Sequence, residues 1–353
     1  MGEKKESCCT IDYQQREEAL VLRREPFLKG PEPMQIAPLK VLASLVLYMA
    51  LMALNAMAHA QSQGSWTMKA PIPTPRNEVA LAAVGGKVHV IGGNVEGVSG
   101  TYHDEYDPAT DRWRTRAPLP QGLDHIGTAV LNGKIYTVGG FVASTHKDGQ
   151  PSVFEYDPAA DAWRSLSPLK SGLGSVAVTV LDGKIHAVGG RNPAGQTVAT
   201  HQVYDPATNA WSERAPLPKA RDHMALVAAE GKIHAVGGRF GASNDKTDMH
   251  DIYDPATNSW TSGPPLPTGR SGLAYTLYQG LILVLGGELA PNTFAENEAY
   301  DPKTKSWRAL APMPGGRHGT AAATTGGHVY IAAGSLKPGS GQITDQLIVF
   351  TLP

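Results

Sequence analysis

Two arginines offer the clearest chemistry in this sequence. Arg191 and Arg239 each directly follow a pair of glycines, in consecutive copies of one repeat. Planar guanidinium groups bind carboxylate or phosphate, so these two side chains could converge on one anion. We expect Ser175 and His223 to lie close by. The sequence therefore predicts a candidate site for an anionic ligand.

The same arginines have a plainer interpretation. They could stack on neighbouring loops, or pair with Glu78 and Glu288 as solvated charges at a rim. Phe141 and Phe240 could offer a stacking surface for sugar rings, although an exposed aromatic side chain is also an ordinary loop residue.

Most of the eleven histidines after Ala60 have a structural interpretation. Three of them precede the first glycine of a pair by three residues, which is typical of a packing position with a polar tip: His89, His186 and His234. Three others precede a repeated tyrosine by three residues: His103, His201 and His250. A metal site would need three separate repeats to converge within about 2.1 Å of one ion, and no local pair spacing supports it. We expect no metal and no cofactor.

Several classes of function lack support. The only cysteines are Cys8 and Cys9, so the rest of the chain has no disulfide and no thiolate chemistry. No Walker-type loop, nucleophile elbow, zinc-site spacing or kinase motif is present. With 31 basic against 32 acidic residues, no global charge favours nucleic acid or an acidic membrane surface.

The N-terminal region resembles an export signal. Residues 41–60 are nearly uncharged, follow Lys40 and end in Ala58-His59-Ala60. This pattern predicts a signal peptide over residues 34–60, cleaved after Ala60, and a periplasmic or secreted protein. A membrane anchor through residues 41–60 is the alternative. Residues 1–33 are then either a cytoplasmic tail or an extension that is never made, if translation starts at Met34.

A repeat fills the remaining chain, residues 61–353. The six tryptophans are 47, 50, 48, 49 and 47 residues apart, and 26 residues after each comes a glycine pair, or in the last copy Ala333-Gly334. Turn dipeptides such as Asn132-Gly133 divide two short apolar runs in every copy, which predicts hairpins. Five copies continue with Tyr-Asp-Pro and place Trp seven residues after the Tyr, which predicts third and fourth strands.

Six such sheets must stack, because one alone cannot bury both faces, and a closed ring protects their edges. The last copy ends with Phe350 at the Tyr position and has no Trp strand of its own. We therefore predict that Ser65–Met68, which carries Trp66, pairs with Ile348–Leu352. The expected fold is an all-β, six-bladed propeller with four antiparallel strands per blade.

Taken together, the double glycine, the tyrosine and the tryptophan resemble the kelch repeat over residues 64–353. In kelch propellers, ligands are commonly bound at two positions of each blade around the channel mouth. The residue after the glycine pair gives the candidates Asn94, Phe141, Arg191, Arg239, Glu288 and Ser335. The start of the innermost strand gives Glu78, His125, Ser175, His223, Gly272 and Gly319. Both sets vary between copies, unlike the framework residues.

The resemblance implies several functions, because kelch propellers include enzymes, adaptors and sugar-binding modules. Copper-dependent galactose oxidases are excluded, since their cofactor needs a cysteine. We expect a monomeric, non-catalytic binding propeller for a carbohydrate, anionic in our first expectation, or for an extracytoplasmic protein. The alternative is a mutarotase like the periplasmic sialic-acid type, in which Glu78, Glu288, His125 or His223 would supply general acid and base.

Overall fold

The computed structural model describes residues 63–143, 146–241, 245–339 and 341–353, together with helical positions 44–46, 48–49 and 52. The chain divides into two units, Met1–Ala53 and Leu54–Pro353. Apart from those helical positions, the predicted signal peptide at 34–60 and the extension at 1–33 lie outside the described residues. No helix in the described part of the chain has the length and apolar character needed to span a bilayer.

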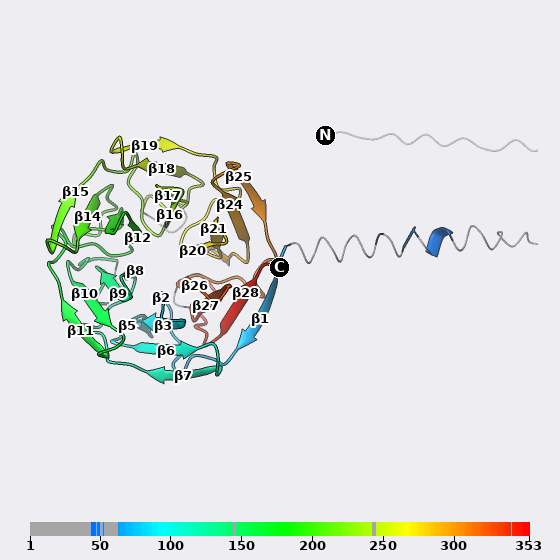
Figure 1. Cartoon of the computed structure of the whole chain (residues 1–353), viewed down its shortest axis with the longest axis horizontal. Coiled ribbons are helices and arrows are strands. Elements are labelled where there is room, and N and C mark those ends of the chain that lie inside the picture. Colours follow the sequence, from blue (N-terminus) through cyan, green and yellow to red (C-terminus); the bar gives the residue numbers. More distant parts are fainter. Residues whose placement is uncertain are drawn as a thin grey trace, which may run out of the picture. The chain divides into compact units, whose positions relative to one another are not determined.

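The second unit is a ring of six four-stranded antiparallel sheets, which confirms the predicted six-bladed propeller (Figure 1). Blade 1 contains β2 (Ala80–Val84), β3 (Lys87–Ile91), β6 (His103–Asp107) and β7 (Arg112–Thr115). Blade 2 contains β8 (Gly127–Leu131), β9 (Lys134–Val138), β10 (Val153–Asp157) and β11 (Ala162–Ser165). Blade 3 contains β12 (Ala177–Leu181), β13 (Lys184–Val188), β14 (His201–Asp205) and β15 (Ala210–Glu213).

The other three blades repeat this order from the channel outward. Blade 4 contains β16 (Ala225–Ala229), β17 (Lys232–Val236), β18 (His250–Asp254) and β19 (Ser259–Ser262). Blade 5 contains β20 (Ala274–Tyr278), β21 (Leu281–Leu285), β24 (Asn297–Asp301) and β25 (Ser306–Ala309). Blade 6 contains β26 (Ala321–Thr325), β27 (His328–Ala332), β28 (Leu347–Thr351) and β1 (Ser65–Lys69). Two short hairpins lie in the loops: β4 (Asn94–Val95) with β5 (Val98–Ser99), and β22 (Glu288–Leu289) with β23 (Asn292–Thr293).

The ring closes as the sequence predicts. Strand β1 pairs antiparallel with β28, with Trp66 opposite Phe350 and their ring centroids 5.0 Å apart. The indole N–H of Trp66 donates to the carbonyl of Ala311 in the connection after blade 5, at 2.8 Å. The N-terminal strand of the propeller therefore completes its last blade.

Each tryptophan ties its blade to the preceding one. Trp113, for example, donates from Nε1 to the carbonyl of Ala70 at 2.8 Å, and the other five make the same kind of bond. Six buried apolar clusters fill the spaces between neighbouring blades. Most of the propeller's core thus lies between blades rather than within one, which explains why a single copy could not fold alone.

The glycine pairs allow neighbouring blades to approach closely. Gly92 has φ of +60°, and a Cβ there would lie 2.4 Å from the carbonyl oxygen of Leu123 in blade 2. The next residue, Gly93, donates its N–H to that same carbonyl at 2.9 Å. In the variant copy, Ala333 adopts the same left-handed conformation, with φ of +62°.

Six of the histidines form three buried pairs inside blades 1, 3 and 4. In each pair Nδ1 of the first ring contacts Nε2 of the second at 2.9 Å: His89 with His103, His186 with His201, and His234 with His250. The second ring of each pair also bonds from Nδ1 to a backbone carbonyl. A carbonyl can only accept, so the second ring donates there and accepts from the first through Nε2. Burial lowers the pKa of all six to about 3 or 4, so they are neutral structural groups.

Candidate functional site

One position in each blade combines an unusual backbone with a variable side chain. It is the second residue before the innermost strand of its blade, and φ there lies between +50° and +67°. We call these six residues the entry ring: Glu78, His125, Ser175, His223, Gly272 and Gly319. Glycine adopts this conformation without strain, as it does in blades 5 and 6. The four other blades carry polar side chains despite the strain.

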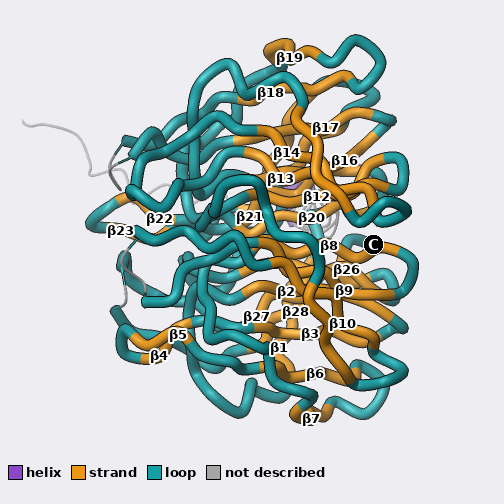
Figure 2. The backbone as a smooth tube through the Cα atoms, turned by 90° about the vertical axis from the view of Figure 1, so that its left-hand side faces the viewer, coloured by secondary structure: helices purple, strands orange, loops and turns teal. Residues whose placement is uncertain are grey.

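A second set supports the entry ring from behind. The residue after each glycine pair forms an antiparallel bridge with the residue that precedes an entry position, as Asn94 does with Asn77. We call this set the second layer: Asn94, Phe141, Arg191, Arg239, Glu288 and Ser335. Hairpins β4–β5 and β22–β23 and the other connections of this layer lie at one end of the propeller, opposite the tight turns (Figure 2).

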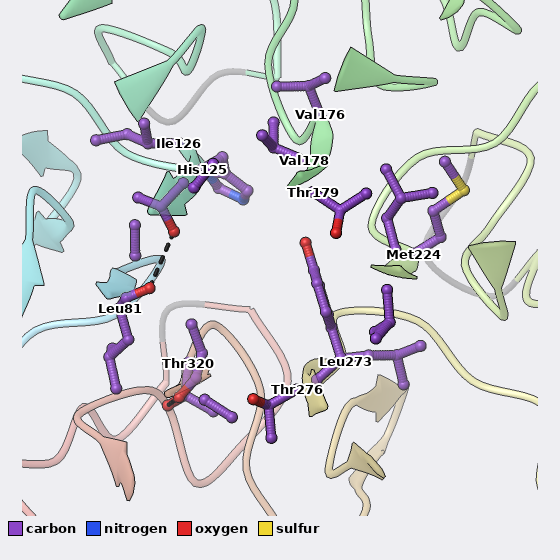
Figure 3. A pocket seen from close by; sticks show the side chains of 18 of the residues that line it. Leu81, His125, Ile126, Val176, Val178, Thr179, Met224, Leu273, Thr276 and Thr320 are labelled. Carbon is purple, nitrogen blue, oxygen red and sulfur yellow. Dashed lines mark hydrogen bonds between the residues drawn. The ribbon is translucent and has the colours of Figure 1, made fainter. Parts of the chain in front are cut away.

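The innermost strands enclose a cavity of about 340 Å³ on the propeller axis (Figure 3). All six entry positions line it, whereas no second-layer residue is among its described lining residues. Below the entry ring the walls are mostly apolar, with the hydroxyls of Thr128, Thr179 and Thr276 between them. Tyr275 from blade 5 reaches the backbone of Val178 in blade 3, and burial raises its pKa to about 12.

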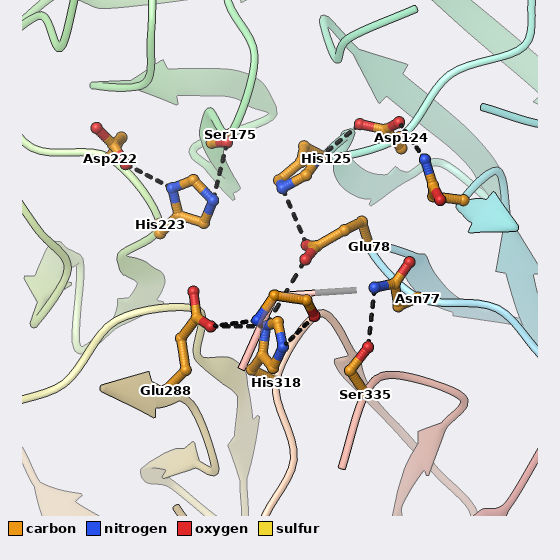
Figure 4. A network of polar contacts seen from close by, with 12 residues as sticks. Asn77, Glu78, Asp124, His125, Ser175, Asp222, His223, Glu288, His318 and Ser335 are labelled. Atoms are coloured by element: carbon orange, nitrogen blue, oxygen red, sulfur yellow. Dashed lines mark hydrogen bonds and ion pairs between the residues drawn. The ribbon is translucent and has the colours of Figure 1, made fainter. Parts of the chain in front are cut away.

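Two entry histidines are held by the aspartates that precede them (Figure 4). Nδ1 of His125 donates to Asp124 at 2.6 Å, and Nδ1 of His223 donates to Asp222 at 2.5 Å. Because Nδ1 carries the proton in both rings, Nε2 is the atom that each ring presents to its other neighbours. Nε2 of His223 accepts from the hydroxyl of Ser175 at 3.2 Å.

The two predicted anion-binding arginines do converge on one anion, but that anion belongs to the protein. Nε of Arg191 lies 3.0 Å from Asp222, and Nε of Arg239 lies 3.2 Å from the other oxygen of the same carboxylate. Arg239 also pairs with Glu288 at 3.0 Å and donates to Nε2 of His223 at 2.9 Å. The plainer interpretation of Arg239, pairing with Glu288, is therefore found, although the pair is buried rather than solvated.

The two entry histidines have opposite electrostatic environments. Burial and the guanidinium of Arg239 lower the pKa of His223 well below its usual value. Burial alone would lower the pKa of His125 too, but the charges of Glu78 and Asp124 outweigh it and raise that pKa. Burial opposes ionisation of Asp222, yet its bond from His223 and its other polar partners bring its pKa far below the usual range.

A third histidine, His318, lies close to both Glu78 and Glu288. His318, the residue before entry position Gly319, has Nδ1 3.7 Å from Glu78 and 3.5 Å from Glu288. Oε1 of Glu78 would lie 2.8 Å from a Cβ at Gly319, so glycine makes room there for the carboxylate.

A histidine that the sequence interpretation missed completes the cluster. His146 lies in the connection between β9 and β10, outside the repeated framework, so no repeat position marked it. Its ring centroid lies 4.7 Å from that of His125 and 5.4 Å from that of His223. Burial, with the nearby positive groups, lowers its pKa to about 3. Imidazoles from separate repeats therefore do come together here, since blades 2 and 4 each supply one.

The ten predicted site residues thus fall into two groups. Four face the cavity from the entry ring: Glu78, His125, Ser175 and His223. The other six support them: Asn94, Phe141, Arg191, Arg239, Glu288 and Ser335. Asn94 and Ser335 are buried and hold the frame, Ser335 by accepting from Asn77 at 2.8 Å.

The structure contradicts the predicted aromatic stacking surface at Phe141. Phe141 is fully buried, with its ring against His125 and His146 and directly beneath Gly174. The ammonium of Lys219 lies over the ring of Phe240, 3.4 Å from its centroid. Phe141 therefore offers no face to a sugar, and Lys219 covers one face of Phe240.

Comparisons with known proteins agree with this framework. A family model described as the KLHDC2/KLHL20/DRC7 Kelch-repeats domain matches residues 175–353, half of the chain. The chain belongs to the kelch-repeat family. A Kelch motif model also matches residues 125–170. Together the two family models cover blades 2 to 6 of this kelch protein.

A solved structure titled "Structure of YjhT" is similar to this kelch propeller, with a TM-score of 0.68 and 18% sequence identity. The similarity covers 80% of this chain and 97% of the other. At this identity it supports the fold alone. Comparison with curated proteins gave no match.

Proposed function

We propose that this kelch propeller binds a small carbohydrate at the entry ring, outside the cytoplasm. The observation that carries this proposal is the strain at four entry positions. Blades 5 and 6 have glycine where φ is positive, whereas Glu78, His125, Ser175 and His223 hold polar side chains in the same conformation. A backbone strained in this way is typical of functional sites, where the role of the side chain offsets the energetic cost of the strain.

The size and chemistry of the cavity suit a sugar. Its volume of about 340 Å³ lies at the lower end of the range for small-molecule sites. Hydroxyl, imidazole and carboxylate groups at the entry ring can exchange hydrogen bonds with sugar hydroxyls, above apolar walls that suit the carbon skeleton.

The local charges favour a neutral sugar over an acid. Arg191 and Arg239 are both bound to Asp222, so a ligand carboxylate would have to compete with a fixed internal one. Two more carboxylates of the same network, Glu78 and Glu288, would repel an anion. We therefore propose a neutral carbohydrate in place of the anionic one that the sequence first suggested.

The predicted signal peptide at residues 34–60 supports action outside the cytoplasm. N-terminal sequencing of the secreted protein tests it: we expect the mature chain to begin at Gln61, and retention of residues 41–60 would indicate an anchor instead.

A thermal-shift titration of the purified protein tests the binding proposal. The panel contains neutral monosaccharides and disaccharides, sugar acids including sialic acid, and peptidoglycan fragments. A ligand at about a hundred times its dissociation constant stabilises the folded state by roughly 2.7 kcal/mol. We expect a neutral sugar to raise the melting temperature of the wild type and to have a smaller effect on His125→Gln. A response to sugar acids alone would overturn the ligand class, and a flat panel would favour a protein partner.

One observation favours a second candidate function, sugar mutarotation. Environments that shift two pKa values in opposite directions are the pattern of an acid–base pair, and His125 and His223 show it with ring centroids 5.2 Å apart. Once Ser175 and Arg239 release it, Nε2 of His223 would take the proton of the anomeric hydroxyl while Nε2–H of His125 gives one to the ring oxygen, so that the bond between the anomeric carbon and the ring oxygen breaks.

Proton NMR of anomer exchange tests this second candidate. We expect catalysed exchange by the wild type, and a loss of about 10²-fold or more in His223→Gln with little change in sugar affinity. Exchange at the uncatalysed rate by a wild-type protein that binds the sugar would leave binding as the sole function.

A further inference from the structure

Three imidazoles from two blades and one connection surround a common point at the top of the cavity. The nearest ligand nitrogens of His125, His146 and His223 all lie within 4.8 Å of one another. The ring centroids are 4.7, 5.2 and 5.4 Å apart. Each imidazole ring carries polar nitrogens on its edge. Three rings packed this closely need polar partners for those nitrogens.

One of these rings has an unsatisfied nitrogen. Nε2 of His146 is buried and makes no hydrogen bond, whereas Nε2 of His125 lies 3.1 Å from the carboxylate of Glu78 and pairs with it when the ring is protonated. Buried polar atoms are nearly always satisfied in folded proteins, so Nε2 of His146 indicates a missing partner.

The remaining nitrogens are held as they are in metal sites. Asp124 and Asp222 accept from Nδ1 of His125 and His223, which fixes each ring and leaves Nε2 as the available ligand atom. A carboxylate on the far nitrogen of a metal-bound histidine orients the ring and raises its basicity.

We propose that His125, His146 and His223 bind one divalent transition-metal cation, with Zn²⁺ as the ion that fits best. Imidazole nitrogens suit zinc, nickel and copper, whereas calcium and magnesium require oxygen ligands. Three histidines leave one tetrahedral position open, which the carboxylate of Glu78 is near enough to fill or to leave for water.

Two local changes accompany binding. Tetrahedral zinc brings its nitrogen ligands to about 3.3 Å from one another, so the cluster must contract. Ser175 and Arg239 must also release Nε2 of His223, while Arg239 keeps its ion pairs with Asp222 and Glu288. The metal site goes beyond carbohydrate binding and needs no sugar. A bound ion would occupy the Nε2 atoms that mutarotation uses, so zinc would inhibit that reaction.

Equilibrium dialysis of the full chain against ZnCl₂, followed by elemental analysis, tests the proposal. Cys8 and Cys9 are replaced by serine and no histidine tag is present, because both would add zinc ligands. We expect one zinc per chain, and for Co²⁺ in its place the visible absorption of a tetrahedral site. The same dialysis against CaCl₂ should give no bound ion.

Variants separate the site from adventitious binding. We expect His146→Ala to lower zinc affinity at least tenfold. His328→Ala is the matched control, because His328 lies at the start of β27 and bonds to Thr351 outside the cluster. Circular dichroism melting verifies that both variants fold, and His223→Asn serves if His146→Ala does not. Zinc binding absent from the wild type, or equal in His146→Ala and His328→Ala, would overturn the proposal.

Discussion

His125 and His223 occupy the same position two blades apart, with their rings edge to face and 5.2 Å between centroids, yet their pKa values shift in opposite directions. The fold treats the two residues alike, since both follow an aspartate, both have positive φ and both line the cavity. The difference comes from their neighbours: Glu78 lies near His125, and Arg239 near His223. The repeated backbone therefore places the two histidines equivalently, and their different neighbouring side chains give them different pKa values.

Replacing Ser175 with glycine should separate stability from function. Ser175 has φ of +50°, where blades 5 and 6 use glycine, so relief of backbone strain offsets the loss of its bond to His223. We expect Ser175→Gly to unfold at the same or a higher temperature and to bind sugar several-fold more weakly. A melting curve and a sugar titration on one preparation measure both. A destabilised variant with unchanged affinity would mean that Ser175 is a structural residue.

Replacement of Asp222 should destabilise the propeller strongly. It is fully buried and binds Arg191, Arg239 and His223, so Asp222→Asn leaves positive charge without its partner. Breaking a buried ion pair in this way costs about 3–5 kcal/mol of unfolding free energy, measured by urea titration.

The matched control is Asp254→Asn. Asp254 pairs with Lys232 at 2.8 Å, but both side chains are in contact with solvent, so this loss should be far smaller than that of Asp222→Asn. Equal effects of the two substitutions would show that the Asp222 network does not hold the site together.

The three buried histidine pairs should make the propeller sensitive to acid. Their pKa values in the folded state are about 3 or 4, against about 6.5 in an unfolded chain. The unfolded state therefore binds more protons below pH 6.5, and stability falls as the pH drops from about 6.5 towards 4. Urea unfolding at a series of pH values should show this fall. The slope of the unfolding free energy against pH counts the protons taken up on unfolding. In the double variant His186→Gln, His201→Gln this number should fall by up to two, and an unchanged slope would refute the role of the pairs.

Ring closure predicts a large effect of a short deletion. Removing residues through Lys69 deletes β1, exposes one edge of β28 and leaves Phe350 without Trp66. We expect a marked drop in melting temperature compared with a chain that begins at Gln61. If the two chains melted together, β1 would contribute nothing to closure.

The repeated features of the fold were predictable because each has a local cause. Tryptophan spacing, glycine pairs and turn dipeptides specify six copies of four strands, and the missing last strand points to Trp66. Positive φ at Asn132 and Gly133 is what the hairpin prediction requires. The signal peptide and cellular location remain predictions.

The site was predictable only in part. The resemblance to kelch propellers, carried over position by position, pointed to the entry ring and the second layer, but it did not show which set faces the cavity. Nor could it show that Arg191 and Arg239 would share Asp222, because that residue precedes the predicted position His223 and is not itself one of the candidate positions. His146 lies in a connection of variable length, where no periodic signal exists. Contacts between blades are set by packing, and spacing alone does not encode them.

The most direct test of the account uses the imidazole signals of the folded protein. ¹⁵N-labelled histidine would be followed by NMR while the neutral sugar with the largest thermal shift is added. The account predicts that the signals of His125 and His223 move with a common dissociation constant, while those of the buried pair His186 and His201 stay in place. Saturable binding that leaves both entry histidines unmoved would contradict it, because the ligand would then lie elsewhere on the propeller.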